Sequence, residues 1–327
     1  MAHNLNEKDG KVSMFYHGDV PWHGLGKRVD KMATASEAIK FANMDFTVKK
    51  APIVANYNGE MLKVEDKFAT LRTDTKQVLG TVGARYEIVQ NTDAFSFFDT
   101  LVGEGEAMYE TAGVLGKGQV IWILAKLPGF IKVNKEDIVD KYLLLMNSHN
   151  GTSSLRAKLT PVRVVCENTL NAALGSRRKQ SDEVRIQHTA SAHDRLEQAH
   201  KLLGLSNAIY NDLGEIFSKM SVTSITGTQL IDYVKTLVPD NEDAVKFNTR
   251  TENIREKILS LHESGRGSDM ARGTVWGAYN SCTEYVDHVW GKNTTQDKKL
   301  ESMWLGAGAT MKEKAFSLAL ELVEIKK

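Results

Sequence analysis

The sequence has few of the residues that cross-link or rigidify a fold. Its 327 residues include two cysteines and five prolines, and Cys166 and Cys282 lie in no disulfide-like or metal-ligand spacing. This excludes a disulfide framework and predicts two buried free thiols in a reducing compartment. No apolar run reaches bilayer-spanning length, and the first residues lack the basic-then-apolar order of a signal peptide. We therefore expect a cytoplasmic protein without a membrane segment.

Net charge is nearly absent as well. The chain carries 42 basic and 41 acidic side chains, which leaves a formal charge of +1. No overall electrostatic field therefore marks it as a nucleic-acid-binding protein, and such an affinity needs a local basic patch. The hydrophobic content of 42% supports a buried core in one large domain or two smaller ones.

Apolar periodicity predicts an α+β fold, with an antiparallel sheet and packed helices in the N-terminal half and a helical C-terminal half. The predicted N-terminal elements are helices at 35–42 and 92–102 and strands at 46–54, 61–71, 78–82, 109–115 and 119–127. The predicted C-terminal helices span 196–220, 229–237, 242–261, 273–289 and 300–324. A polar stretch between the halves predicts domains 1–175 and 192–327 joined by a basic linker, 176–191.

The most informative segment begins with a predicted hairpin. Asn150-Gly151 is a strong signal for a two-residue turn, because both residues tolerate positive φ. Such a turn sets Leu155, Ala157 and Leu159 opposite Met146, Leu144 and Tyr142 on one face of the strand pair. The second face then carries Arg156 and Lys158.

A capped helix is predicted to follow this hairpin. Thr160 is placed as N-cap, Pro161 suits the first helical position, and Gly175 suits the C-terminal cap. Arg163 would then face outward in the first turn, where a cation opposes the helix dipole. A phosphate at this helix N-terminus would satisfy both the arginine and the unpaired N–H groups.

A plainer interpretation stands beside the phosphate site. Arg163 and Glu167 can form an i, i+4 pair on a solvated helix face, and Arg156 and Lys158 can be ordinary exposed strand residues. The basic cluster between Leu155 and Ile186 can likewise be a solvated linker. The predicted nucleic-acid- or phosphate-binding residues are Arg156, Lys158, Thr160, Arg163, Arg177 and Arg178, with Lys117 at the tip of the hairpin 109–127.

Other site chemistry is not supported by the sequence. His17 and His23 flank Asp19, but their spacing matches no metal-ligand signature. There is no Gly-x-Ser-x-Gly turn and no Walker loop. We predict no catalytic residue, no metal and no cofactor.

Several segments together resemble a known family. They are Tyr86-Glu-Ile-Val-Gln-Asn91, Glu110-Thr-Ala-Gly113, Ser148-His-Asn-Gly-Thr152, Thr160-Pro-Val-Arg-Val-Val-Cys-Glu-Asn-Thr-Leu170, Thr274-Val-Trp-Gly-Ala-Tyr-Asn280 and Tyr285-Val-Asp-His288. The chain resembles, over most of its length, the phage/plasmid-like protein family catalogued as a domain of unknown function. The resemblance implies a mobile genetic element in a bacterial cell and supplies no reaction.

The order of predicted elements from Thr92 to Leu174 is also similar in layout to the core of Rad52-type single-strand annealing proteins. That similarity implies a self-associating protein that holds single-stranded DNA in a basic groove. The leading hypothesis is therefore a non-catalytic single-stranded nucleic-acid-binding protein, acting in annealing or recombination. One alternative is a nucleotide- or phosphoester-acting enzyme using His149 or Asn168, and another is a structural or host-interaction protein.

Overall fold

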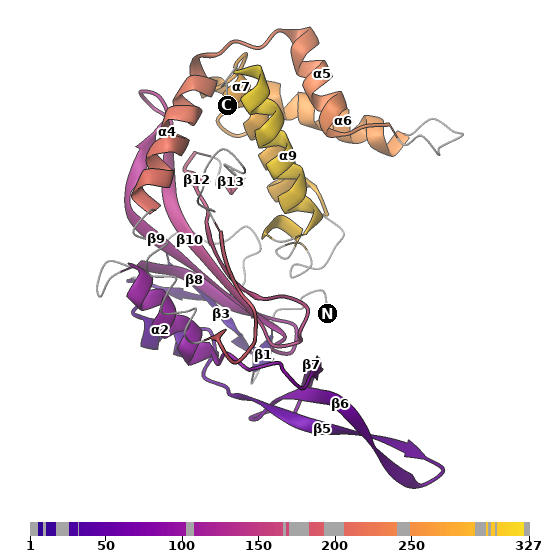
Figure 1. Cartoon of the computed structure of the whole chain (residues 1–327). Helices are drawn as coiled ribbons and strands as arrows, with labels where there is room; N and C mark the ends of the chain where they lie inside the picture. Colours follow the sequence, from indigo (N-terminus) through magenta and orange to yellow (C-terminus); the bar gives the residue numbers. More distant parts are fainter. Residues whose placement is uncertain are drawn as a thin grey trace. The chain divides into compact units, whose positions relative to one another are not determined.

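The computed structural model describes residues 6–8, 11–17, 26–31, 33–102, 108–165, 168–169, 183–192, 206–240, 249–291, 299, 302–304 and 306–323. The chain divides into two compact units, whose elements are drawn in Figure 1. Unit 1 comprises Met1–Pro128, Tyr142–Leu159 and Glu183–Leu205, and unit 2 comprises Gly129–Lys141, Thr160–Asp182 and Ser206–Lys327. The α+β prediction is confirmed, since antiparallel sheets occur together with helices that concentrate in the C-terminal half.

Unit 1 is built on one large sheet. Its strands run in the order β4 (Lys27–Val29), β3 (Met14–His17), β8 (Met108–Leu115), β9 (Val120–Lys132), β10 (Ile138–Ser148), β11 (Leu155–Leu159) and β14 (Glu183–Ile186). The central strands β9 and β10 are buried on both faces, as their runs of consecutive buried apolar residues show, and Phe15, Ile123, Leu145 and Leu155 are fully buried. Two short strands, β1 (Glu7–Lys8) and β2 (Lys11–Val12), pair separately.

Two helices of unit 1 agree with the sequence prediction. Helix α1 (Ala35–Phe41) packs on β3 and β8, and α2 (Asn91–Val102) packs on α1. Thr34 and Glu37 form a capping box at the start of α1, in which each side chain satisfies a backbone N–H of the other residue. The local capping signals therefore fix where this helix begins.

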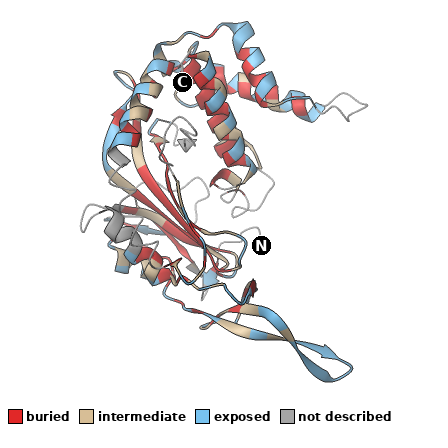
Figure 2. Ribbon diagram, viewed as in Figure 1, coloured by how far each residue is buried: buried red, intermediate tan, exposed pale blue. Residues whose placement is uncertain are grey.

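A second sheet in unit 1 contains β5 (Val48–Tyr57), β6 (Glu60–Arg72) and β7 (Val78–Gly83). The predicted turn between β5 and β6 is confirmed, with positive φ at Asn58 and Gly59. The two strands form a long hairpin whose distal half is mostly exposed (Figure 2). We call residues 53–64 the hairpin arm.

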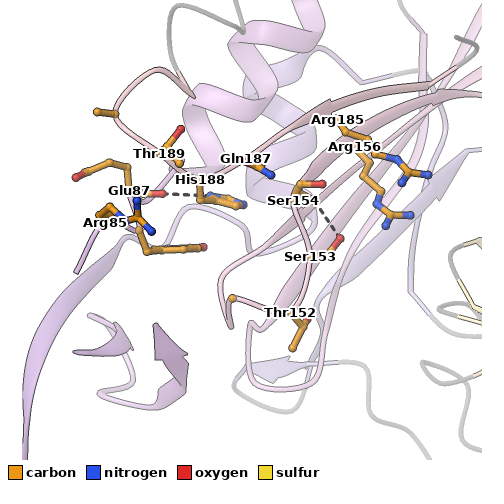
Figure 3. A pocket seen from close by; sticks show the side chains of 13 residues that line it. Arg85, Glu87, Thr152, Ser153, Ser154, Arg156, Arg185, Gln187, His188 and Thr189 are labelled. Carbon is orange, nitrogen blue, oxygen red and sulfur yellow. Dashed lines mark hydrogen bonds between the residues drawn. The ribbon is translucent and has the colours of Figure 1, made fainter. Parts of the chain in front are cut away.

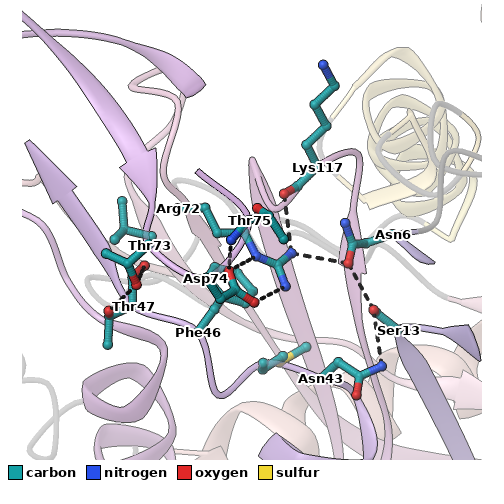
Figure 4. A network of polar contacts seen from close by, with 12 residues as sticks. Asn6, Ser13, Asn43, Phe46, Thr47, Arg72, Thr73, Asp74, Thr75 and Lys117 are labelled. Atoms are coloured by element: carbon teal, nitrogen blue, oxygen red, sulfur yellow. Dashed lines mark hydrogen bonds and ion pairs between the residues drawn. The ribbon is translucent and has the colours of Figure 1, made fainter. Parts of the chain in front are cut away.

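Arg72 fastens this second sheet to its surroundings (Figure 4). Its fully buried guanidinium donates to both carboxylate oxygens of Asp74, at 2.7 and 3.1 Å, and to Asn6 Oδ1 at 3.1 Å. It also lies 3.9 Å from the centroid of the Phe46 ring and donates to the Lys117 carbonyl. A buried charge with this many partners is compensated and holds the base of β6 in place.

Unit 2 combines a small strand group with helices. The first residues of β10, Val139 and Asp140, pair with β12 (Val162–Arg163), which pairs with β13 (Asn168–Thr169). The helical elements are α4 (Ser206–Val222), α5 (Gly227–Leu237), α6 (Thr249–Ser264), η2 (Ser268–Met270), α7 (Val275–Glu284), the π-helical η3 (Tyr285–Val289) and α9 (Ala307–Leu322). Every residue of α7 is buried, because α4, α6 and α9 pack around it. None of the helices in the described ranges is long and apolar enough to cross a membrane.

The predicted helix after Thr160 is wrong. Val162 and Arg163 form β12 instead, and β13 follows at Asn168–Thr169. Thr160 therefore caps no helix, and Gly175 lies outside the described residues. The reason is tertiary, since pairing of this segment with β10 overrides capping signals that are only a weak local preference.

The predicted register after Tyr142 is off by one residue. Leu143, Leu145 and Met146 lie opposite Leu159, Ala157 and Arg156, because β10 and β11 are joined by the longer loop 149–154. Apolar residues of β10 therefore share a face of the sheet with Arg156 and Lys158. A shift of one residue in strand pairing moves every side chain of one strand to the opposite face relative to its partner.

The chain also divides differently from the predicted domain ranges. Strand β14 lies inside the segment predicted as a linker, and Gly129–Lys141 and Thr160–Asp182 group with the C-terminal helices. Strands β9 and β10 each contribute residues to both units, so the two units cannot be separated by a single boundary in the sequence.

Candidate functional site

Unit 1 contains an open groove of about 1350 Å³ at one end of its main sheet (Figure 3). Three stretches that are distant in sequence line it. Residues 85–87 come from the segment after β7, residues 151–154 from the loop between β10 and β11, and residues 187–190 from the segment after β14. Arg156 of β11 and Arg185 of β14 complete the lining.

The loop 149–154 is ordered by one asparagine. Asn150 Oδ1 accepts hydrogen bonds from Ser148 Oγ at 2.6 Å, Thr152 N at 3.0 Å and Thr152 Oγ1 at 2.6 Å. Gly151 has a φ of +78°, which places the following residues against the groove. A Cβ on Gly80 of β7 would lie 2.6 Å from backbone atoms of Asn150, so this close approach requires glycine. The loop is therefore held from both sides.

Tyr86, Glu87 and His188 join the first stretch to the third. Glu87 N donates to the His188 carbonyl at 3.0 Å, and His188 Nδ1 lies 3.2 Å from the Glu87 carbonyl. The Tyr86 and His188 rings stack with centroids 4.7 Å apart, and the Tyr86 hydroxyl donates to the Ser148 carbonyl at 2.8 Å. Lys50 Nζ donates to the carbonyls of Ala84 and Tyr86. These contacts hold two segments that lie about a hundred residues apart in the sequence against each other, and together the segments form one side of the groove.

The groove carries more positive than negative charge. Arg85 is exposed and makes no hydrogen bond or ion pair with other residues that the structure describes. Arg156 and Arg185 occupy facing positions on β11 and β14, and both lie near Glu183, at 3.6 and 2.6 Å. One carboxylate is therefore shared by two guanidinium groups, and a phosphate oxygen can complete the pairing of either.

The sequence-predicted site residues that the structure describes have different surroundings. Arg156 lines the groove, but Lys158 is only 8% exposed on the same strand. Lys117 is exposed at the β8–β9 tip, where its side chain points away from the Arg72 cluster (Figure 4). Thr160 is buried in unit 2 and is followed by strand β12, so it does not form the predicted phosphate site at a helix N-terminus. Arg177 and Arg178 lie outside the described residues.

The prediction that Arg163 faces outward is wrong. Its side chain is 1% exposed, and its Nε and Nη2 donate to the Asp137 carboxylate at 2.6 to 2.9 Å. Trp276 Nε1 donates to the same carboxylate at 2.8 Å, and the Gly267 carbonyl accepts from Arg163 Nη2. The sequence suggested a bound phosphate as the counter-ion of Arg163, whereas the structure has the Asp137 carboxylate in that role. Arg163 is a structural residue of unit 2.

Several lining residues were missed from sequence, among them Arg85, Tyr86, Arg185 and His188. Arg85 and Tyr86 precede α2 in a segment without basic clustering, and Arg185 and His188 lie within the stretch 176–191 that is predicted as a linker. The sequence did contain a signal, because Tyr86 begins a segment that carries the family resemblance. Nothing in a single sequence indicates that this segment meets residues 187–190.

His149 makes the enzyme alternative less suitable. It is fully buried, its Nε2 donates to Asn91 Oδ1 at 2.8 Å, and its ring packs edge-on against Phe46. Burial, with a smaller effect of nearby His188, lowers the pKa of His149 to about 3. A side chain with this low basicity and no exposure is a poor general base at neutral pH. In the described part of the chain, no cluster of three or more histidine, cysteine or acidic side chains could hold a metal.

This depressed pKa predicts acid sensitivity. An unfolded histidine protonates near pH 6.5, whereas folded His149 stays neutral until about pH 3. Protons therefore bind the unfolded chain more readily, and the stability that neutral His149 contributes above pH 6.5 is lost progressively as pH falls toward 3. We expect a loss of roughly 2 kcal/mol between pH 6.5 and 5, measured by urea denaturation at each pH.

His149→Gln is the matched variant, because its side-chain amide keeps a donor for Asn91 Oδ1 and does not titrate. The wild-type protein should lose more stability on acidification than the variant does. Equal losses in the two proteins would contradict the assignment.

The fold and groove together define a class: an α+β protein with an open, arginine-lined groove. Residues 78–304 match the family described as Domain of unknown function (DUF932), and the chain belongs to that family. No curated protein and no solved structure matches the chain. The matched range contains all the groove residues.

Proposed function

We propose that the protein binds single-stranded nucleic acid along the groove of unit 1, without catalytic turnover, in annealing or recombination on a phage or plasmid. Single-stranded DNA is the proposed partner, and the bacterial cytoplasm the proposed location. The observation that carries the proposal is the convergence of Arg85, Arg156 and Arg185, from three separate segments, on one open groove. Arginines on a groove of this kind track a phosphate backbone.

The remaining lining suits a polymer better than a small substrate. The hydroxyls of Ser154 and Thr189 and the amide of Gln187 offer neutral hydrogen bonds to sugar and phosphate oxygens. The groove is open and lacks the enclosed apolar walls that small-molecule sites typically have. These features support backbone binding and give no direct means of reading base sequence.

The test is a titration of the protein into fluorescent single-stranded DNA, duplex DNA and a mononucleotide at several salt concentrations. Three backbone contacts predict a slope of log K against log salt of roughly −2 for single strands. Tight mononucleotide binding without oligonucleotide binding would favour the phosphoester-acting enzyme. Indifference to all three ligands would leave the structural or host-interaction protein.

Self-association is the second part of the proposal. On the hairpin arm, Tyr57 is 67% exposed, Met61 60% and Leu62 43%, and no described element covers them. The arm contains one acidic and one basic residue, Glu60 and Lys63, so two identical arms do not repel each other. A surface with exposed apolar side chains and no net charge suits a protein neighbour and not a phosphate backbone. We therefore propose a second copy of this chain as the occupant.

Sedimentation velocity tests this proposal. The wild-type protein should sediment as an oligomer, and the double variant Tyr57→Ser, Leu62→Ser should shift toward monomer without loss of secondary structure. Glu65→Ser with Asp66→Ser, at exposed positions next to the arm, is the control and should not change the distribution. A monomeric wild-type protein, or an unchanged double variant, would refute the arm contact.

A further inference from the structure

His188 supplies a second kind of recognition in the groove. The residue is 6% exposed, lines the groove, and comes from the stretch that follows β14. Figure 3 shows its ring lying between Arg85 and Glu87 on one side and Ser154 on the other. The imidazole is therefore buried in the groove lining between the outer arginines.

The hydrogen-bonding partners of His188 fix which nitrogen carries the hydrogen. Nδ1 lies 3.2 Å from the Glu87 carbonyl oxygen, which only accepts, so Nδ1 is the donor. Burial lowers the pKa of the imidazole, and the bond to Glu87 opposes this only in part, so the ring is neutral at pH 7. Nε2 is left with a lone pair directed away from Glu87.

This lone pair has no partner. Nε2 is buried and accepts no hydrogen bond from the residues that the structure describes. Tyr86 stacks on the ring but donates its hydroxyl to Ser148, and burial keeps His149 uncharged. An unsatisfied buried acceptor is unfavourable, so a ligand that donates a hydrogen bond at this point gains affinity. A phosphate oxygen cannot do so, because it is itself an acceptor.

We propose that His188 Nε2 accepts a hydrogen bond from the 2′-hydroxyl of a ribonucleotide whose phosphates lie on the groove arginines, so that the groove prefers RNA to DNA. The inference rests on the proposed function and deepens it: the arginines hold the phosphates of DNA and RNA alike, and the sugar contact adds single-stranded RNA as a second partner that is bound more tightly. A 2′-hydroxyl is a donor that every ribonucleotide carries, whatever its base, and it separates RNA from DNA at a given contact. A base amine is also a donor, but only some bases carry one, so the sugar is the donor that suits a groove whose arginines bind a backbone of any sequence.

The probes are fluorescent oligouridine and oligodeoxyuridine of equal length, which differ at the 2′ position and not in the base. One hydrogen bond predicts roughly 3- to 10-fold tighter binding of oligouridine by the wild-type protein. His188→Asn keeps an amide donor where Nδ1 bonds Glu87 and removes the acceptor at Nε2. It should bind the two probes equally, with oligodeoxyuridine affinity within twofold of wild type.

His17→Asn is the matched control, because His17 Nδ1 also lies within bonding distance of a carbonyl, that of Val29, and the residue is outside the groove. It should keep the ribose preference. Equal wild-type binding of both probes, or an equal loss of both in His188→Asn, would overturn the ribose contact alone. Preference for oligodeoxycytidine over oligodeoxyuridine would assign the donor to a base amine and also overturn it. Binding of neither strand would instead overturn the proposed function.

Discussion

Asp137→Ala is expected to lower the free energy of unfolding by about 3–5 kcal/mol, the usual effect of removing one partner of a buried ion pair. The substitution removes the carboxylate that accepts from both Nε and Nη2 of the buried Arg163 guanidinium. It also removes the acceptor of the Trp276 indole N–H, which lies in the fully buried helix α7. Urea denaturation followed by far-ultraviolet circular dichroism measures the change.

Glu136→Ala is the control for Asp137→Ala, because Glu136 is the exposed neighbouring carboxylate. Its free energy of unfolding should lie within about 0.5 kcal/mol of the wild-type value, as is usual for surface substitutions. Arg163→Ala should lower the free energy of unfolding by a similar amount, since it removes the other partner of the same ion pair. An Asp137→Ala protein as stable as the Glu136→Ala protein would show that the ion pair does not stabilise unit 2.

The triple variant Arg85→Ala, Arg156→Ala, Arg185→Ala is expected to weaken single-stranded oligonucleotide binding by on the order of 100-fold at low salt. It should also remove most of the salt dependence, because each lost arginine removes roughly 0.7 from the slope for single strands. Fluorescence anisotropy at three or more salt concentrations measures both quantities.

A matched variant separates the groove from net charge. Lys49→Ala, Lys67→Ala, Lys76→Ala removes the same formal charge from exposed positions of unit 1 outside the groove and the hairpin arm. It should retain the wild-type salt slope, because contact and not overall field releases counterions. If both triple variants lose affinity equally, the binding is a general charge effect and the groove has no special role.

Much of the fold follows from local signals in the sequence. Helix α1 begins at its capping box, the β5–β6 turn lies at Asn58-Gly59, and β8 and β9 meet at the glycine-flanked Lys117. In each case, neighbouring residues supply the whole physical reason for the conformation. The sequence therefore predicts these elements well.

The failures occur where distant partners decide. Thr160 and Pro161 are good helix-start signals, but Arg163 meets Asp137 and Val162 pairs with Asp140, so this segment becomes a strand. Asn150-Gly151 is a good hairpin signal, but Gly80 of β7 lies against the Asn150 backbone and His149 N donates to the Gln119 carbonyl, so the connection becomes a longer loop. The identity of such partners is not contained in local spacing.

The groove could be predicted only in part for the same reason. Arg156 was identified because it alternates with apolar residues on a strand, and this feature is local. Arg85 and His188 enter the groove through the reciprocal bonds between Glu87 and His188, which join segments about a hundred residues apart. Without those contacts, a histidine after a polar stretch is indistinguishable from a solvated one.

Hydrogen exchange with and without a bound single-stranded oligonucleotide tests the central claim most directly, because it locates the bound strand without any substitution. The account predicts slower exchange in residues 85–87, 151–154 and 187–190 when the oligonucleotide is added, with no change in helix α7. Binding that protects other segments and leaves these three stretches unchanged would contradict it.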